Sequence, residues 1–197
     1  MQPGAFFHEA GQLELLATGV LPALARSRRR LRLWSAGCGA GEEAWSVAMI
    51  VDEADLPAAV AVEIVATDAD PRALAVAAEA VYRDDQMRPV SAERRRRHFV
   101  RGVGPRHGLW RVIAPLRDRV ELRALDLDGP WPAAPGFDVV LCHAPIARLV
   151  ARDAEPLVRR LAAVLTPGGA LFLAGPAPPG IPGLDACAPG VYRRCTR

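Results

Sequence analysis

The chain has 197 residues, of which 51% are hydrophobic and 24% are charged, and its formal net charge is +3. This length and apolar content argue against a disordered protein and against two full-sized domains, so we treat residues 1–197 as one domain. No run approaches the roughly 18 apolar residues of a membrane-spanning helix, and no targeting segment opens the chain. We therefore expect a cytoplasmic protein that does not insert into membranes.

All 25 basic residues are arginines, and residues 94–97 form one dense basic run within an expected helix. We interpret this run as a solvated helix face; the alternative is a surface for an acidic partner or nucleic acid. No base-reading motif accompanies it, so we expect no nucleic-acid binding. The chain has four cysteines, Cys38, Cys142, Cys187 and Cys195. They lack CxxC spacing, which predicts reduced thiols and no metal site.

Short apolar runs alternate with helical stretches along the chain, which is the pattern of a mostly parallel α/β sheet. Strands are expected at residues 31–36, 62–67, 120–124, 137–142 and 170–174. Helices are expected between them at residues 42–54, 71–80 and 152–165. Pro and Gly at residues 166–169 should stop the last helix in a turn. The Pro- and Gly-rich tail at residues 175–190 is predicted to be a loop, and a further edge strand is expected around Tyr192.

Residues 83–119 interrupt this alternation. They contain an expected helix at residues 91–98, a turn at Gly104-Pro105 and an extended segment at residues 109–113. This order predicts a small inserted β subdomain that projects from the parallel sheet. Its exposed edge could pair with an extended peptide by strand addition.

A ligand-binding loop is expected at residues 33–43, which run from a strand through small residues into the acidic start of a helix. Gly37, Gly39 and Gly41 let a ligand approach the backbone, and the helix start offers unpaired amides. Glu42 and the glutamate after it disfavour a pyrophosphate and suit a cation, such as the amino group of a methionine moiety or a sulfonium. A dinucleotide oxidoreductase is therefore disfavoured, although its Gly-rich loop is similar.

Acidic residues follow two further strands. Asp68 ends the second expected strand, where it can accept hydrogen bonds from a ribose diol. Asp70 precedes a proline and is assigned to helix capping instead. Asp126 and Leu127 follow the next strand, where a side chain and a backbone amide could bracket an adenine; the alternative is a turn into Gly129.

Taken in chain order, these segments resemble the catalytic domain of the CheR family of chemotaxis receptor methyltransferases, over nearly the whole chain. The resemblance implies a Rossmann-like α/β methyltransferase fold, S-adenosylmethionine as cofactor and receptor glutamates as acceptors. It also implies that residues 83–119 correspond to a subdomain that can dock a receptor-tail peptide. The motifs that carry it are Phe6-Phe7-His8-Glu9, Trp34-Ser35-Ala36, Gly41-Glu42-Glu43, Ala66-Thr67-Asp68, Val81-Tyr82, Arg101-Gly102-Val103-Gly104-Pro105 and Thr166-Pro167-Gly168-Gly169.

The chain departs from the family pattern at several places. The family's Thr-x-Phe-Phe-Arg ends here in His8, so a site arginine becomes a histidine. Its Arg-Asn pair and a nearby Tyr align with His143-Ala144 and Arg148, and its His-Ser-Glu becomes residues 175–177. The family's helical N-terminal domain has no counterpart in this sequence.

The resemblance therefore predicts that Glu42 and Asp68 keep their amino-group and ribose roles, while the groups that face the acceptor differ. We expect His8 and His143 to orient an acceptor at the mouth of the site, with His143 also beside the cofactor; the alternative for each is a packed or surface histidine. The leading hypothesis is a CheR-type methyltransferase with weak or no activity on receptor glutamates. The rival is a non-catalytic cofactor-binding or scaffolding module in a signalling complex.

Overall fold

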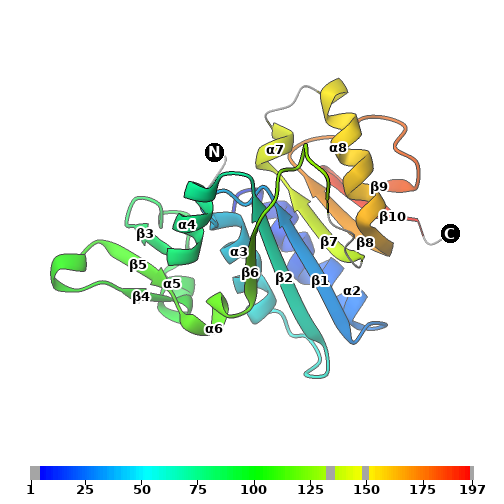
Figure 1. Ribbon diagram of the computed structural model, residues 1–197. Helices are drawn as coiled ribbons and strands as arrows, with labels where there is room; N and C mark the ends of the chain where they lie inside the picture. The colour runs from blue at the N-terminus through cyan, green and yellow to red at the C-terminus, as the bar shows by residue number, and fades with distance from the viewer. Residues whose placement is uncertain (1–4, 132–135, 148–150, 196–197) are drawn as a thin grey trace.

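The computed structural model describes residues 5–131, 136–147 and 151–195. Its centre is a seven-stranded sheet in the order β6-β2-β1-β7-β8-β10-β9 (Figure 1). β10 runs antiparallel to β8 and β9, and the remaining neighbours pair in parallel. The strands are β1 (Arg30–Ala36), β2 (Ala61–Asp68), β6 (Val120–Ala124), β7 (Phe137–Cys142), β8 (Leu165–Leu173), β9 (Leu184–Ala188) and β10 (Val191–Arg194).

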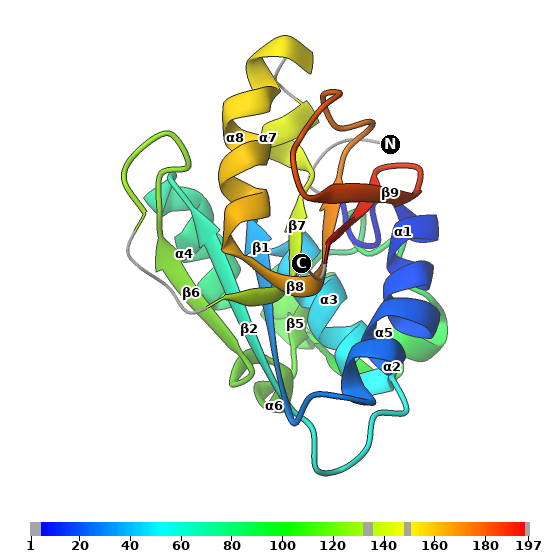
Figure 2. The same cartoon turned by 90° about the vertical axis from the view of Figure 1, so that its right-hand side faces the viewer.

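Helices cover both faces of this sheet (Figure 2). One face carries α3 and the N-terminal helical stretch, and the opposite face carries α8. This is the Rossmann-like α/β arrangement that the sequence predicts. The elements are α1 (Ala10–Leu15), the π-helical turn η1 (Leu16–Val20), α2 (Leu21–Ala25), α3 (Glu42–Glu53), α4 (Pro71–Glu79), α7 (Ala144–Ala147) and α8 (Ala151–Val164). None of the helices in the described residues is both long and apolar enough to cross a membrane.

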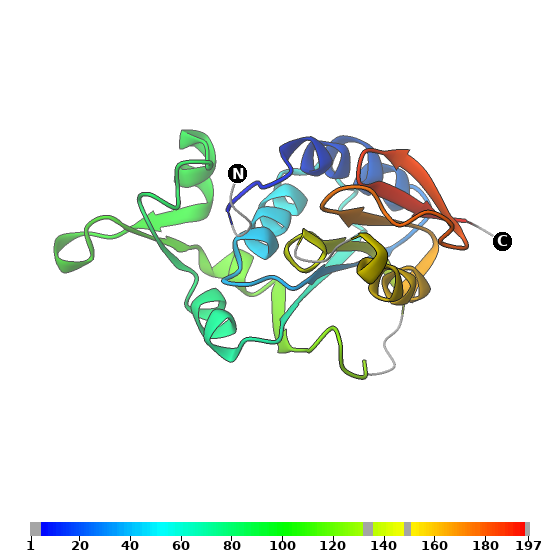
Figure 3. The same ribbon diagram turned by 90° about the horizontal axis from the view of Figure 1, so that it is seen from above.

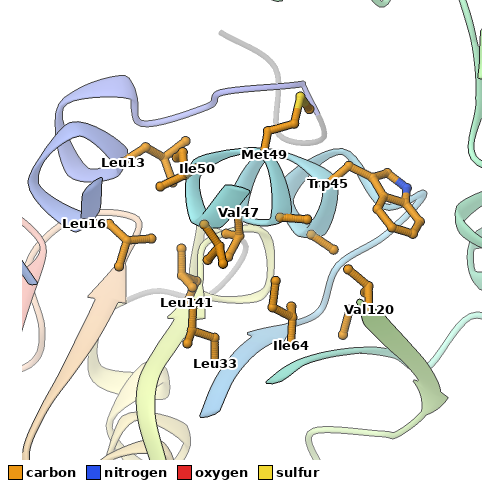
Figure 4. Close-up of a cluster of buried hydrophobic side chains, with 14 of the residues drawn as sticks. Leu13, Leu16, Leu33, Trp45, Val47, Met49, Ile50, Ile64, Val120 and Leu141 are labelled. Carbon is orange, nitrogen blue, oxygen red and sulfur yellow. The ribbon is translucent and has the colours of Figure 1, made fainter. Parts of the chain in front are cut away.

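The buried strands present apolar side chains to both layers, because successive side chains point to opposite faces. Leu33 and Leu141 point toward Val47 of α3 (Figure 4). Their neighbours Trp34 and Val140 belong to the core on the α8 side. This double burial explains why β1 and β7 read as nearly continuous apolar runs in the sequence.

Helix α3 lies between the sheet and the N-terminal helical stretch. Leu13 and Leu16 face Ile50 of α3 (Figure 4). Met49 and Trp45, which precede Ile50 in the same helix, are also buried. A helix that is apolar on nearly all sides needs such cover on more than one side. Residues 10–25 form this helical cover, although no helix was predicted there from the sequence.

A second, antiparallel sheet with the order β3-β5-β4 projects from one side of the large sheet (Figures 1 and 3). The segment expected at residues 109–113 forms its central strand, outside the large sheet. The small sheet begins two residues before the expected boundary at residue 83. Its elements are β3 (Val81–Arg83), α5 (Ala92–His98), β4 (Phe99–Arg101), the 3-10 turn η2 (Gly104–Arg106), β5 (Leu109–Val112) and α6 (Ala114–Arg117).

Ion pairs dock α5 against α3. Nε and Nη2 of Arg94 both donate hydrogen bonds to the carboxylate of Glu53. The guanidinium carbon of Arg94 lies 4.2 Å from the ring centroid of Phe7. Arg97 pairs with Asp52 at 2.9 Å. Within the basic run of residues 94–97, Arg94 therefore contacts α3, whereas the whole run was expected to be a solvated helix face.

The C-terminal part differs from the sequence expectation in two respects. Residues 166–169, expected as a turn, lie within β8, where the pairing with β7 is irregular and Gly168 has φ of 75°. The tail expected as loop contains β9, so β10, which carries Tyr192, is an interior strand. Gly183 and Gly190 have positive φ and form the turns before and after β9. The Gly-rich composition of this tail therefore marks the two ends of a strand.

Candidate functional site

A cavity of about 320 Å³ opens where β1, β2 and β7 end. This edge of a parallel sheet is where Rossmann-like folds place their ligands, and the volume lies at the lower end of ordinary ligand pockets. The structure therefore brings residues from distant segments to one place. Six of the predicted site residues line the cavity: His8, Gly37, Gly39, Glu42, Asp68 and His143.

The three predicted loop glycines all have positive φ but have different surroundings. A Cβ at Gly37 would lie 2.2 Å from Cγ of Pro145, so this glycine lets the loop after β1 touch α7. A Cβ at Gly39 would meet no atom within 4 Å and would occupy the open cavity. A Cβ at Gly41 would lie 2.7 Å from the indole nitrogen of Trp45, inside the protein. Only the first two line the cavity.

Asp68 is held at the rim of the cavity by two backbone amides. Its Oδ2 accepts a hydrogen bond from the N–H of Gly39 at 2.8 Å, and its Oδ1 accepts one from the N–H of Asp70 at 2.9 Å. A carboxylate has about four acceptor positions, so both oxygens can accept further bonds from a diol. Asp70 caps α4 by accepting from the N–H of Arg72, which confirms the assignment made from the sequence.

Glu42 is a buried carboxylate at the first position of α3. Glu42 is 5% exposed. The hydroxyl of Ser46 donates to its backbone carbonyl at 2.7 Å, but within the described residues no side chain donates a hydrogen bond to its carboxylate. Burial raises the pKa of Glu42 above its ordinary value, although a backbone hydrogen bond acts in the opposite direction. Because a buried carboxylate without a cation is costly, the cavity is suited to a positively charged group at this point.

Cys38 lies between the loop glycines and lines the same cavity. Burial, and then the charges of Asp68 and Glu43, raise the pKa of its thiol to about 12. The thiol therefore stays protonated at neutral pH and is a poor nucleophile.

His8 reaches the cavity from a strained segment. The residues on either side of it, Phe7 and Glu9, have φ of 52° and 56°, which is rare for side chains of this size. Nδ1 of His8 is buried and has no hydrogen-bond partner in the described structure. The Nε2 atom lies 3.5 Å from a carboxylate oxygen of Glu9. One ring nitrogen of His8 is thus buried without a hydrogen-bond partner.

His143 has both ring nitrogens engaged by other side chains. Nδ1 lies 2.6 Å from Oε2 of Glu43, and Nε2 lies 2.9 Å from Oε1 of Gln12. Glu43 also accepts a hydrogen bond from the hydroxyl of Ser35 at 2.5 Å. His143 is only 3% exposed, so its surroundings fit a packed histidine better than a free acid or base.

Asp126 and Leu127 do not line the cavity. Asp126 accepts hydrogen bonds from the backbone of Asp128 and of Gly129, which is the turn considered as the alternative for this segment. The carbonyl of Leu127 accepts from Arg160 at 2.6 Å. The segment nevertheless starts beside the site, because the N–H of Leu125 donates to the carbonyl of Asp68.

The sequence was then compared with known families and proteins. The family described as "CheR methyltransferase, SAM binding domain" matches residues 2–176. The chain belongs to the CheR methyltransferase family. This confirms the resemblance stated from the motifs, and it confirms S-adenosylmethionine as the cofactor of the matched domain.

Three curated CheR-type relatives illustrate the likeness. Chemotaxis protein methyltransferase 2 of Pseudomonas aeruginosa is 36% identical over 176 residues, which cover 87% of this chain and 61% of the relative. Chemotaxis protein methyltransferase 1 of the same organism is 34% identical over 200 residues, covering 96% and 72%. The chemotaxis protein methyltransferase of Escherichia coli is 32% identical over 172 residues, covering 85% and 58%. The chain thus spans roughly six to seven tenths of these relatives.

The departures from the CheR pattern gather around the cavity. His8 and Ala144 line it, and Pro176 lines a neighbouring cavity of about 600 Å³. Arg148, which takes the place of a family tyrosine, lies outside the described residues, as does Gly4, which takes the place of the family threonine. The departures that fall on these described residues therefore lie at or beside the cavity.

Sequence reasoning missed three contributors to the site. Gln12 contacts His143, Glu43 links that histidine to β1, and the Tyr82 hydroxyl donates to the carbonyl of Ala40 at 2.7 Å. Tyr82 was noticed only as part of a family motif, and Glu43 only as part of such a motif and as a carboxylate that suits a cationic ligand. Gln12 carries no distinguishing local signal, because Glu14 and Thr18 are also polar in the same helical stretch.

Proposed function

We propose that this chain binds S-adenosylmethionine in the cavity at the ends of β1, β2 and β7 and transfers its methyl group to a protein acceptor. The observation that carries the proposal is the pairing of a buried, cation-free carboxylate, Glu42, with a glycine loop that leaves room for a ligand at Gly39. Membership of the CheR family supports the same cofactor.

Each residue has a proposed role toward the cofactor. Glu42 pairs with the amino group of the methionine moiety, and Asp68 accepts hydrogen bonds from the ribose hydroxyls. Gly37 and Gly39 allow the backbone to approach, whereas Gly41 shapes the loop from inside. Adenine would extend toward Asp126 and Leu127, whose segment begins beside Asp68. These are ordinary roles for strand-end residues in Rossmann-like sites.

The bound cofactor supplies a methyl group on a positively charged sulfur, which a nucleophile on the acceptor displaces in line. The chain contributes alignment and exclusion of water, and no general base is indispensable when the nucleophile is a carboxylate. His8 lines the cavity and is proposed to orient the acceptor. Cys38 does not compete as a methyl acceptor because its thiol stays protonated.

The acceptor is proposed to be a protein or peptide that docks on an inserted subdomain formed by residues 83–119 within a single domain. The relatives' names, chemotaxis protein methyltransferase, support a signalling protein as acceptor. A cytoplasmic location is part of this proposal. Because His8 replaces an arginine and Ala144 an asparagine, we expect transfer to receptor glutamates to be weak: arginine can hold a carboxylate through two parallel hydrogen bonds, and a neutral histidine cannot.

Two measurements test the proposal. Calorimetric titration with S-adenosylhomocysteine should show binding, and absence of binding at millimolar ligand would overturn the assignment of the cavity. Transfer of labelled methyl to a chemoreceptor cytoplasmic fragment should be weak for this chain and stronger for the His8→Arg, Ala144→Asn double variant. Binding without transfer by either protein to any offered acceptor would favour the non-catalytic scaffold.

A further inference from the structure

The side-chain amide of Gln12 has a defined orientation. Its Nε2 donates hydrogen bonds to the carbonyl oxygens of Leu173 at 2.9 Å and of Pro189 at 3.4 Å. Carbonyl oxygens only accept, so the nitrogen end of the amide must face them. The oxygen end therefore faces Nε2 of His143 at 2.9 Å. Since an amide oxygen also only accepts, this ring nitrogen must carry a hydrogen.

The other ring nitrogen of His143 faces a carboxylate. Nδ1 lies 2.6 Å from Oε2 of Glu43, whose second oxygen accepts from Ser35. With an acceptor on each side, the ring satisfies both neighbours only when both of its nitrogens carry hydrogens, which is the imidazolium form. A short contact between an imidazolium and a carboxylate is a charge-assisted hydrogen bond, the strongest ordinary kind.

We propose that His143 is a positioning residue that works as a lasting buried cation, holding the start of α3 to α1, and that it is neither the acid nor the base of the reaction. Through Glu43 it fixes the helix turn that carries Glu42, and through Gln12 it fixes the ends of β8 and β9. The proposal deepens the proposed function, because it takes the cavity as the cofactor site. It replaces the expectation that His143 orients the acceptor directly.

The charges around His143 favour its protonated form. Burial alone lowers the pKa of the imidazole, but the hydrogen bond and charge of Glu43, together with the charge of Glu9, outweigh burial and raise that pKa above its ordinary value of 6.5. Burial raises the pKa of the adjacent Cys142 thiol, which therefore stays neutral. The ring of His8 lies edge-on to that of His143, with the two ring centroids 6.3 Å apart.

Loss of this proton would break the arrangement. A neutral ring has one nitrogen without hydrogen, and that nitrogen would then face either the oxygen of Gln12 or the carboxylate of Glu43. Two acceptors in contact repel, so one of the two links must open. We therefore expect cofactor binding to weaken as the pH rises through the raised pKa of His143.

The first test reads the proton directly. Nitrogen NMR of the full chain, with labelled histidine assigned by the His143→Gln variant, should show the imidazolium signature of His143 at neutral pH, above the ordinary histidine pKa of about 6.5. A neutral tautomer at that pH would overturn the proposal, whatever the cofactor data show.

The second test follows S-adenosylhomocysteine affinity by calorimetry from about pH 6 to about pH 9, a range that brackets the histidine pKa. The unmodified chain should lose affinity at the high end. His143→Arg, with a fixed charge, should be flat over this range, and His143→Gln should bind roughly tenfold more weakly at low pH, as for a lost charged hydrogen bond. His107→Gln, at an exposed histidine that does not line the cavity, is the control and should keep the pH dependence.

The outcomes separate the two proposals. If His143→Gln has the same pH profile and affinity as the unmodified chain, the positioning role is wrong. If no variant binds the ligand at any pH, the proposed function fails, and the NMR measurement still decides the protonation of His143.

Discussion

The hydroxyl of Tyr82 donates a hydrogen bond to the carbonyl of Ala40 at 2.7 Å, and so joins the small sheet to the glycine loop. The tyrosine is fully buried, and its ring meets that of Phe6 edge-on at 4.8 Å. Burial, followed by the charge of Glu42, raises the pKa of the phenol, so the hydroxyl remains a donor at every physiological pH. The shape of the glycine loop thus depends on a residue of β3.

Tyr82→Phe should weaken S-adenosylhomocysteine binding by about 0.5–1.5 kcal/mol, because it removes the hydrogen bond and leaves the carbonyl of Ala40 without that partner. Calorimetry and thermal unfolding should be measured together. The matched control is Tyr192→Phe, whose hydroxyl accepts from the N–H of Ala177 outside the cofactor cavity. Equal affinities for the two variants would mean that Tyr82 does not shape the site.

Asp68→Ala should reduce S-adenosylhomocysteine affinity by roughly 1–3 kcal/mol, since both its contact to the N–H of Gly39 and its proposed bonds to the ribose disappear. The comparison is Asp70→Ala, which loses the cap of α4 and should cost about 1 kcal/mol of folding stability with little change in affinity. Calorimetry at one temperature, with chemical denaturation of each variant, separates the two effects. Similar affinity losses in both variants would contradict the ribose role.

Alanine substitutions at two glycines should have different effects. Gly39→Ala places a methyl group in the open cavity, so it should lower ligand affinity about tenfold and cost about 1–2 kcal/mol of stability from its left-handed backbone. Gly37→Ala has the same kind of backbone strain and also collides with Pro145, so its melting temperature should fall further. A larger loss of stability in Gly39→Ala would show that the loop packs differently.

Glu53→Gln should destabilise the fold by about 1.5–3 kcal/mol at neutral pH, because Arg94 and His98 lose a charged partner. Burial works to raise the pKa of Glu53, but these two partners outweigh it and the pKa is lowered. A lowered carboxylate pKa gives stability that is present above the ordinary value of 4.5 and is lost as the pH falls through the folded-state pKa. The difference from the unmodified chain should therefore shrink in acid.

The control for that experiment is Glu63→Gln. Glu63 also pairs with two arginines, but one of them, Arg30, is 70% exposed, and Glu63 has no fully buried partner such as His98. Its loss should therefore be smaller, about 0–1 kcal/mol. Thermal melts of both variants over a pH series would check the prediction. A Glu53 effect that is independent of pH would point to packing as the cause.

The parts of the site that sequence could predict are those that follow strands directly. Asp68 is the last residue of β2, and Glu42 opens α3 after the loop that follows β1. Parallel strands bring their ends to one edge of a sheet, so the order of these segments along the chain predicts that the two residues are neighbours. Gln12 meets His143 across 131 positions of sequence, and no periodicity reports such a contact. The same limit explains why the helical cover of residues 10–25 was missed.

The close approach of Gly37 and Pro145 also has a consequence for protein engineering. Because the proline ring fills the space that a side chain at residue 37 would need, the loop after β1 and the start of α7 behave as one structural unit. A chimaera that exchanges either segment with that of a relative should take both segments from the same parent.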